Sequence, residues 1–228
     1  MSKELFIGLD PSASPIKASG ISVINSVGKV VFLGKWHENE ELLKIIASFP
    51  DSTDTIAIDG PLQPPHELRR CCFSAESAEC PHQQTTPFKG RYCEQLLLKR
   101  GFRCFVSSKN SFAKKWMERC FQLNDFLHEL ALETIEVFPH ATRKILFPEL
   151  QGRKQKREFR TRLQVQLEGI GIKFPAPPKI YSHDELDAVL AAITNVLYVQ
   201  GKTEKLGDEQ DGYIHIPRNP GTHLQYII

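Results

Sequence analysis

The chain has 228 residues, of which 41% are hydrophobic, and its formal net charge is +2 at pH 7. It can therefore bury a full core as a single domain over 1–228. No apolar run approaches the roughly 18 residues of a membrane span, and the N-terminus has no secretory pattern, so we expect a cytoplasmic protein without a membrane partner. The six cysteines do not form the pattern of a small disulfide scaffold, which indicates free thiols. The oligomeric state is left open.

The first sixty residues predict a small sheet in which two strands end at an aspartate. The apolar segment 5–9 ends at Asp10, and a later apolar strand ends at Asp59, directly before Gly60 and Pro61. Between them the pattern predicts two further strands and an amphipathic helix, over 20–25, 29–36 and 40–49.

A long irregular segment follows the fourth strand. Residues 63–90 are rich in Pro, His, Ser and Cys and are too long for an ordinary connection, which indicates a functional or metal-held loop. The elements predicted after it are a helix over 91–100, a short strand over 102–108, a long helix from Ser111 to about Leu132, and a fifth strand over 133–138 that contains Glu136.

The C-terminal part is organised around a helix that begins at Ser182. Ser182 and Glu185 form a capping box, and apolar residues recur at helical spacing as far as Val199. Asp184 and Asp187 lie on a neighbouring face that continues with small side chains, so this helix can pack closely on another element. The flanking segments are a basic helix around 158–168 and a polar tail over 201–228 with one possible strand at 213–216.

The order of these elements brings the acidic residues together. A strand, a helical crossover and a second strand form a right-handed parallel unit, so the first, fourth and fifth strands should be parallel. Ligands of open α/β sheets bind at the carboxyl edge of such strands. Asp10, Asp59 and Glu136 should meet there, and the last helix should bring Asp184 and Asp187 onto them.

Such a cluster of carboxylates needs a compensating cation, because like charges at one point disfavour ionisation. Oxygen ligands suit Mg²⁺ or Mn²⁺, and two such ions about 4 Å apart can activate water and stabilise the leaving oxygen in phosphodiester cleavage. Each aspartate alone is better explained as a strand-end or turn residue. The combination predicts a metal-dependent nuclease or phosphodiesterase.

Five segments carry a resemblance to a known family. They are IGLDPSASPIKASGISVI, TIAIDGPL, GRYCEQLLLKRGFRCF, TIEVFPHATRKIL and HDELDAVLAAITNVLY. In this order they resemble a predicted nuclease family catalogued as domain of unknown function 429, and the last is similar to the terminal helix of RuvC-type resolvases. The resemblance implies an α/β, RNase H-like fold with a five-stranded mixed sheet in the order 3-2-1-4-5, flanked by helices, with an enlarged insertion between strands 4 and 5.

The resemblance also implies catalytic roles by position. Asp10 would be the metal ligand of the first strand and Asp59 that of the fourth. Asp184 or Asp187 would be the metal ligand on the last helix. Glu136 matches the glutamate of the fifth strand.

Substrate-binding roles follow in the same way. Arg91 and Glu94 match an Arg-x-Cys-acid motif, and Lys156 matches a basic position that would bind the scissile phosphate. Lys17 lies in a strand–turn–strand segment that resembles the phosphate loop of actin-like phosphotransferases. That function is less favoured, because the chain is too short for the duplicated domain of those enzymes.

The irregular segment also allows a structural zinc site. Cys71, Cys72, Cys80, His82 and Cys93 could supply four ligands. They lack the paired Cys-x-x-Cys spacing of a zinc ribbon, and buried free cysteines explain them at least as well.

A noncatalytic binding module is the main alternative function. It would use a basic cluster to bind nucleic acid or a protein, although a solvated helix face is the commoner explanation of such a charge run. The cluster consists of Arg153, Lys154, Lys156, Arg157, Arg160 and Arg162. Nucleic acid is the expected partner of the catalytic protein, and the choice between DNA, RNA, hybrid, junction and small nucleotide stays open.

Overall fold

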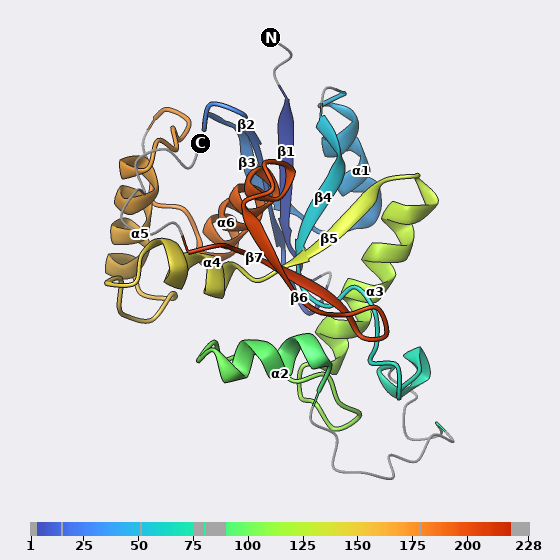
Figure 1. Cartoon of the computed structure of the whole chain (residues 1–228). Coiled ribbons are helices and arrows are strands. Elements are labelled where there is room, and N and C mark those ends of the chain that lie inside the picture. The colour runs from blue at the N-terminus through green and yellow to red at the C-terminus, as the bar shows by residue number, and fades with distance from the viewer. Residues whose placement is uncertain are drawn as a thin grey trace.

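A mixed sheet of seven strands forms the centre of the protein, in the order β3-β2-β1-β4-β5-β7-β6 (Figure 1). The computed structural model describes residues 4–14, 16–50, 52–74, 80, 90–177 and 179–219. The strands are β1 (Leu5–Asp10), β2 (Ser19–Asn25), β3 (Val30–Trp36), β4 (Ser52–Asp59), β5 (Glu133–Val137), β6 (Thr203–Asp208) and β7 (Gly212–Pro217).

The central strands are parallel and the two edges are antiparallel. β1 pairs in parallel with β4, β4 with β5, and β5 with β7. β2 pairs antiparallel with both β1 and β3, and β6 pairs antiparallel with β7. The predicted order 3-2-1-4-5 is confirmed, whereas the predicted count of five strands is wrong.

The two additional strands come from the segment that the sequence left largely unplaced. The possible strand over 213–216 is confirmed as β7. β6 has the sequence TEKLGD, in which Leu206 is the one apolar side chain, so it lacks the alternation that predicts a strand. It forms because β7 pairs with its whole length, from Thr203 opposite Pro217 to Asp208 opposite Gly212.

Helices cover both faces of the sheet. α1 and α3 lie on one face, and α4, α5 and α6 lie on the other, where their apolar side chains form separate cores with the strands (Figure 1). No helix in the described ranges is long and apolar enough to cross a membrane. The helices are α1 (Asn39–Ala47), α2 (Tyr92–Lys99), α3 (Lys114–Glu129), α4 (Pro139–Leu146), α5 (Arg157–Gly169) and α6 (His183–Val199), with a short 3₁₀ turn at Arg70–Cys72.

Two predictions around β5 need correction. The segment 102–108 is not a strand, and the backbone N–H of Ser107 donates to the Glu94 carboxylate at 2.8 Å instead of to a sheet partner. Pro139 does lie beyond the end of β5, but it also begins α4, which the sequence pattern did not predict. Proline fits this first helical position because its missing N–H would have no partner there.

Helix α6 lies directly on the backbone of β1 and β2. A Cβ added at Gly8 would lie 2.2 Å from the Ala192 nitrogen and 2.4 Å from the Ala188 oxygen, and one at Gly20 would lie 2.2 Å from the Asp184 oxygen. Glycine in the strands and alanine on the helix therefore permit the approach. The small face predicted for this helix is the face that packs on the sheet.

A buried amide connects α6 to the sheet at its middle. Asn195 is fully buried, and its Nδ2 donates to the Ile7 oxygen at 3.2 Å and the Thr55 oxygen at 2.8 Å. These two oxygens belong to β1 and β4. The helix is therefore held above the boundary between the two strands that end in Asp10 and Asp59.

We predict that Gly8→Ala destabilises the protein by about 1–3 kcal/mol, the usual cost of forcing an extra group into a packed core. The added methyl group meets helix backbone, which cannot rotate away. The free energy of unfolding in denaturant measures this. Gly34→Ala is the matched strand control, because its Cβ would meet the Phe32 ring, a side chain that can move. Equal stability of the two variants would contradict this packing.

Candidate active site

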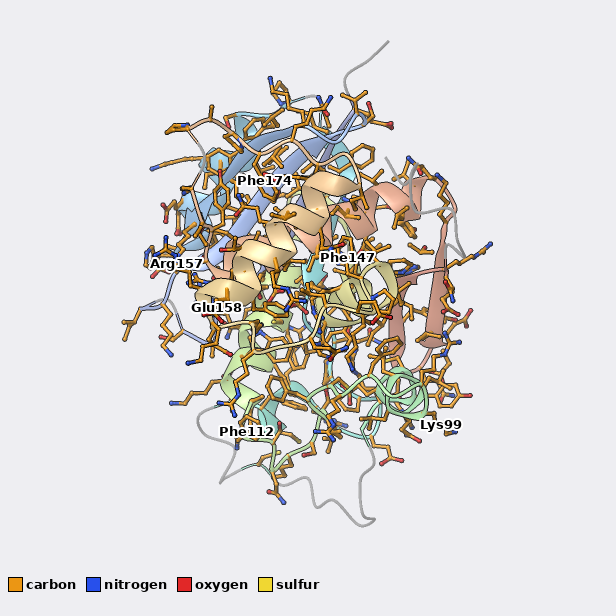
Figure 2. The ribbon with its side chains drawn as sticks, turned by 90° about the vertical axis from the view of Figure 1, so that its left-hand side faces the viewer. Lys99, Phe112, Phe147, Arg157, Glu158 and Phe174 are labelled. Atoms are coloured by element: carbon orange, nitrogen blue, oxygen red, sulfur yellow. The ribbon has the colours of Figure 1, made fainter. Side chains whose placement is uncertain are left out.

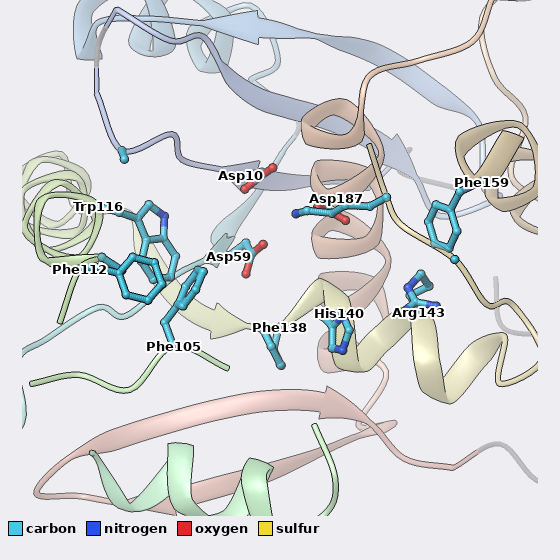
Figure 3. A pocket seen from close by; sticks show the side chains of 14 residues that line it. Asp10, Asp59, Phe105, Phe112, Trp116, Phe138, His140, Arg143, Phe159 and Asp187 are labelled. Atoms are coloured by element: carbon cyan, nitrogen blue, oxygen red, sulfur yellow. The ribbon is translucent and has the colours of Figure 1, made fainter. Parts of the chain in front are cut away.

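Three aspartates from three elements converge at the carboxyl edge of the sheet. Asp10 ends β1 and Asp59 ends β4, and the parallel pairing of Leu9 with Ile58 places these ends side by side. Successive side chains of a strand alternate between faces. Ile7 and Leu9 face the α1 and α3 side, so Asp10 faces α6, and Asp187 meets it from the second turn of α6 (Figure 3).

The three carboxylates are close enough to share a cation. One carboxylate oxygen from each of Asp10, Asp59 and Asp187 lies within 4.8 Å of the other two. Oxygens bound to one Mg²⁺ lie about 2.0–2.1 Å from the ion and so fall within such a distance of one another. Of the predicted metal ligands, these three are brought together.

The electrostatics of this acid cluster disfavour three free negative charges. Burial, followed by repulsion from Asp59 and Asp187, raises the pKa of Asp10 well above its usual value. Burial and repulsion from Asp187 raise the pKa of Asp59 to about 8. The carboxyl group of Asp59 therefore holds a proton near neutral pH unless a cation replaces it.

Lys154 is the basic residue that reaches the acid cluster. Its Nζ donates to Asp187 Oδ2 at 2.6 Å, and Asp187 and Asp10 together raise its pKa although burial opposes this. The resemblance to the nuclease family implies Lys156 for the phosphate position. Lys156 is instead exposed at the start of α5, where Arg157 and Glu158 also face outwards (Figure 2).

Asp184 is not part of the acid cluster. Its Oδ1 lies 2.7 Å from His183 Nδ1. Although burial opposes it, the neighbouring imidazole lowers the pKa of Asp184. Asp184 is one turn away from Asp187 and faces the β2 side of the sheet, where its backbone meets Gly20. Of the two helix acids, the structure brings Asp187 and not Asp184 into the acid cluster.

Glu136, Arg91 and Glu94 form a separate buried network. The Arg91 guanidinium donates to both oxygens of Glu136, at 2.8 and 2.6 Å, and to Glu94 Oε1 at 2.9 Å. Glu136 Oε2 also accepts the backbone N–H of Leu62 at 3.1 Å. All three charged side chains are at most 5% exposed.

This network corrects three predicted roles. The Glu136 carboxylate is occupied by Arg91 and is not a member of the acid cluster. Arg91 and Glu94 are buried and paired with each other, and Arg91 is also paired with Glu136. Lys17 is exposed in the turn after β1, where its backbone oxygen accepts from the Ser12 hydroxyl at 2.5 Å, and it does not line the pocket described next.

The acid cluster lies in a pocket of about 530 Å³ whose other walls are largely aromatic (Figure 3). Phe105, Phe112 and Trp116 stand on one side of the acids, and His140, Arg143 and Phe159 stand on the other. Burial and nearby cations lower the pKa of His140 to about 4, so its imidazole is neutral at pH 7.

Sequence analysis missed most of these pocket residues. Trp116 lies within the helix predicted from Ser111 to about Leu132, and Phe105 lies within the strand predicted over 102–108. Phe112 follows the predicted cap Ser111 and shows no periodic signal, while Arg143 lies in the unpredicted helix α4. Lys154 was recognised only as one of several basic residues in a charged segment.

A second cluster of possible metal ligands lies in the irregular segment. The sulfur of Cys80 is 3.2 Å from that of Cys71 and 3.4 Å from that of Cys72, so these three thiols can bind a metal ion. Cys93 is not among them, because it is buried with Leu97 in the core beneath α2. His82 lies outside the described residues.

No family model, curated protein or solved structure matches this chain. The resemblance to the RNase H-like nuclease family therefore stays a prediction. The chemistry of the pocket has to be argued from the arrangement of its own residues.

We predict that the metal-free protein loses stability as the pH rises from about 6.5 to about 8, above the range in which His140 and His215, whose pKa values burial lowers to about 4, act in the opposite direction. In this range the folded state holds a proton on Asp59, whose pKa is raised from 3.8 to about 8, while the unfolded chain has released it. The free energy of unfolding therefore falls until the folded-state group is also ionised. Denaturant unfolding across this range, without divalent ions, measures the slope.

Mg²⁺ should stabilise the protein more at about pH 8 than at about pH 5, because it replaces the proton in the acid cluster. Thermal unfolding at both pH values measures the rise in Tm. Asp59→Asn should remove this rise, and Asp184→Asn, an acid outside the acid cluster, should keep it. A rise in Tm that is the same in Asp59→Asn as in the parent would show that the ion binds elsewhere.

Proposed function

We propose that this protein is a metal-dependent phosphodiesterase that cleaves nucleic acid, on a sheet of the RNase H-like type. The observation that carries the proposal is the convergence of Asp10, Asp59 and Asp187 within 4.8 Å at the carboxyl ends of two parallel strands. Magnesium or manganese is the ion of choice, because all three ligands are hard oxygen donors.

The scaffold supports this proposal through its connectivity. An antiparallel meander, β1 to β3, is followed by the parallel strands β4 and β5, in the order that the resemblance implies. β7 and β6 extend this sheet beyond β5 and carry α2 beneath them.

The chain's own residues would bind and orient the phosphate. Asp10, Asp59 and Asp187 would hold the ion, which would supply a Lewis acid and an activated water. Lys154 lies beside the ligands and would turn its ammonium from Asp187 to a phosphate oxygen. Arg143 lines the same pocket and adds a second positive charge, whereas His140 is neutral at pH 7 and contributes none.

One observation favours a noncatalytic binding module as the second candidate. The contact between Lys154 and Asp187 neutralises part of the acid cluster without any ion. A degenerate scaffold would keep this contact for stability and use the exposed residues Arg153, Lys156 and Arg157 to bind nucleic acid. The two candidates differ in whether the parent protein hydrolyses any substrate.

The function is tested by incubating the protein with labelled single-stranded and duplex DNA and RNA in Mg²⁺ or Mn²⁺. Loss of a residue that hydrogen-bonds to a metal ligand usually lowers metal affinity or activity by about 10–100-fold. Asp10→Asn removes a ligand itself, so it should lower the cleavage rate by at least about 100-fold. Its stability should not fall, because the variant relieves repulsion. Asp184→Asn should keep activity. Retained cleavage in Asp10→Asn, or no cleavage by the parent, would contradict the mechanism.

We further propose zinc as the ion for Cys71, Cys72 and Cys80, because thiolates are its usual structural ligands. Protein purified from zinc-containing medium should hold about one zinc per chain by elemental analysis. Cys80→Ser should lose it, and Cys104→Ser, a cysteine in another core, should retain it. A Cys71–Cys80 disulfide found by thiol titration and mass spectrometry, with no zinc, would exclude the proposal.

A further inference from the structure

Three aromatic rings form an exposed wall on one side of the acid cluster. Phe105 packs edge to face against Phe112 and Trp116, with ring centroids 5.1 and 5.8 Å apart. Phe112 is 88% exposed and Phe105 is 52% exposed. A contiguous exposed aromatic surface at the mouth of a charged pocket is typical of a ligand-binding surface and not of a core.

The wall is rigidly attached to the acid cluster. Trp116 Nε1 donates to the Pro11 oxygen at 3.0 Å, and its Cζ2 would lie 3.1 Å from a Cβ added at Gly60. Pro11 and Gly60 directly follow Asp10 and Asp59. The indole therefore has a set position relative to the two strand-end acids, as Figure 3 shows.

The side chains of the wall can stack against a flat ligand but offer it no free polar atom. The indole N–H of Trp116 is already bonded to protein, and Phe105 and Phe112 carry no polar atoms. A ligand that fits must offer a flat apolar face at this end. At the other end it must offer negative charge to the cation that the acid cluster would hold, beside Lys154 and Arg143.

A nucleotide satisfies both conditions, and the pocket has the size for it. Its volume of about 530 Å³ lies within the range of about 300–1,000 Å³ that is usual for small-molecule sites. A base within a duplex is paired and stacked on both faces, so it can reach the wall only after it leaves the helix. Single strands and unpaired ends offer such bases without this cost.

We infer that the wall of Phe105, Phe112 and Trp116 binds an unpaired nucleobase, which stacks on the exposed ring of Phe112, while the adjacent phosphate lies at Asp10, Asp59 and Asp187. This inference rests on the proposed function and specifies its substrate as single-stranded nucleic acid or an unpaired end. Recognition is indifferent to base sequence, because every base has a stacking face and the wall has no free hydrogen-bonding group.

The test measures binding of a fluorescein-labelled single-stranded oligonucleotide and of a baseless sugar–phosphate oligomer of the same length. The parent should bind the first more tightly and should show quenching of tryptophan fluorescence with it alone. Phe112→Ala should weaken binding of the oligonucleotide by roughly 5- to 150-fold, the usual range for loss of one base–aromatic stack, and leave the baseless oligomer unaffected. Tyr92→Ala, an exposed aromatic on α2 outside the pocket, should change neither.

The outcomes separate this inference from the proposed function. Equal binding of the two oligomers by the parent, or unchanged binding in a folded Phe112→Ala, overturns base stacking even if Asp10→Asn abolishes cleavage. A faster cleavage of duplex than of single strands also overturns it. If the parent binds the oligonucleotide more tightly than the baseless oligomer and Phe112→Ala weakens this binding, stacking is supported. This holds even if the parent cleaves no substrate and the proposed hydrolytic function is rejected.

Discussion

The close approach of α6 to the sheet is the constraint on which the rest of the site depends. Gly8 and Gly20 leave no side chain between strand and helix, and Ala188 and Ala192 present only small groups from the other side. Asn195 then replaces water as the partner of two sheet carbonyls. This packing positions Asp187, because it brings that residue close to the ends of β1 and β4.

The same approach creates an electrostatic conflict. Three carboxylates share a partly enclosed volume, where burial and mutual repulsion raise the pKa values of Asp10 and Asp59. Lys154 relieves part of the repulsion but cannot neutralise all three charges. A fold under selection for stability alone would place apolar residues here, so this arrangement is typical of a site that binds a cation and an anionic ligand.

The surroundings of the acid cluster are more rigid than their irregular sequence suggests. Arg91 holds Glu136, and Glu136 in turn holds the backbone of Leu62 in the loop after β4. His66 lies farther along this loop. Its backbone N–H and its imidazole both bond to Asp211, in the turn between β6 and β7. Charged residues that resemble catalytic groups in the sequence therefore act as supports, while the aromatic pocket wall supplies the surface that a ligand would contact.

Local sequence patterns were sufficient to predict much of the fold of this protein. Alternating and helical periodicity located β1 to β5 and α6, and the capping box at Ser182 is present with both of its hydrogen bonds. Strand direction placed Asp10 and Asp59 at one edge, because parallel strands end together. These features depend on residues close in the chain, which is why the sequence could predict them.

Only the tertiary structure shows which acid, which lysine and which aromatic residues lie together in the pocket. Asp184 and Asp187 fit the pattern equally well, and the rotation of α6 on the sheet selects Asp187. Lys154 and Lys156 are two residues apart, and the path of the chain into α5 selects Lys154. Trp116 is brought to Pro11 by packing between segments 105 residues apart. β6 becomes a strand because β7 pairs with it, since long-range partners can override weak local preference.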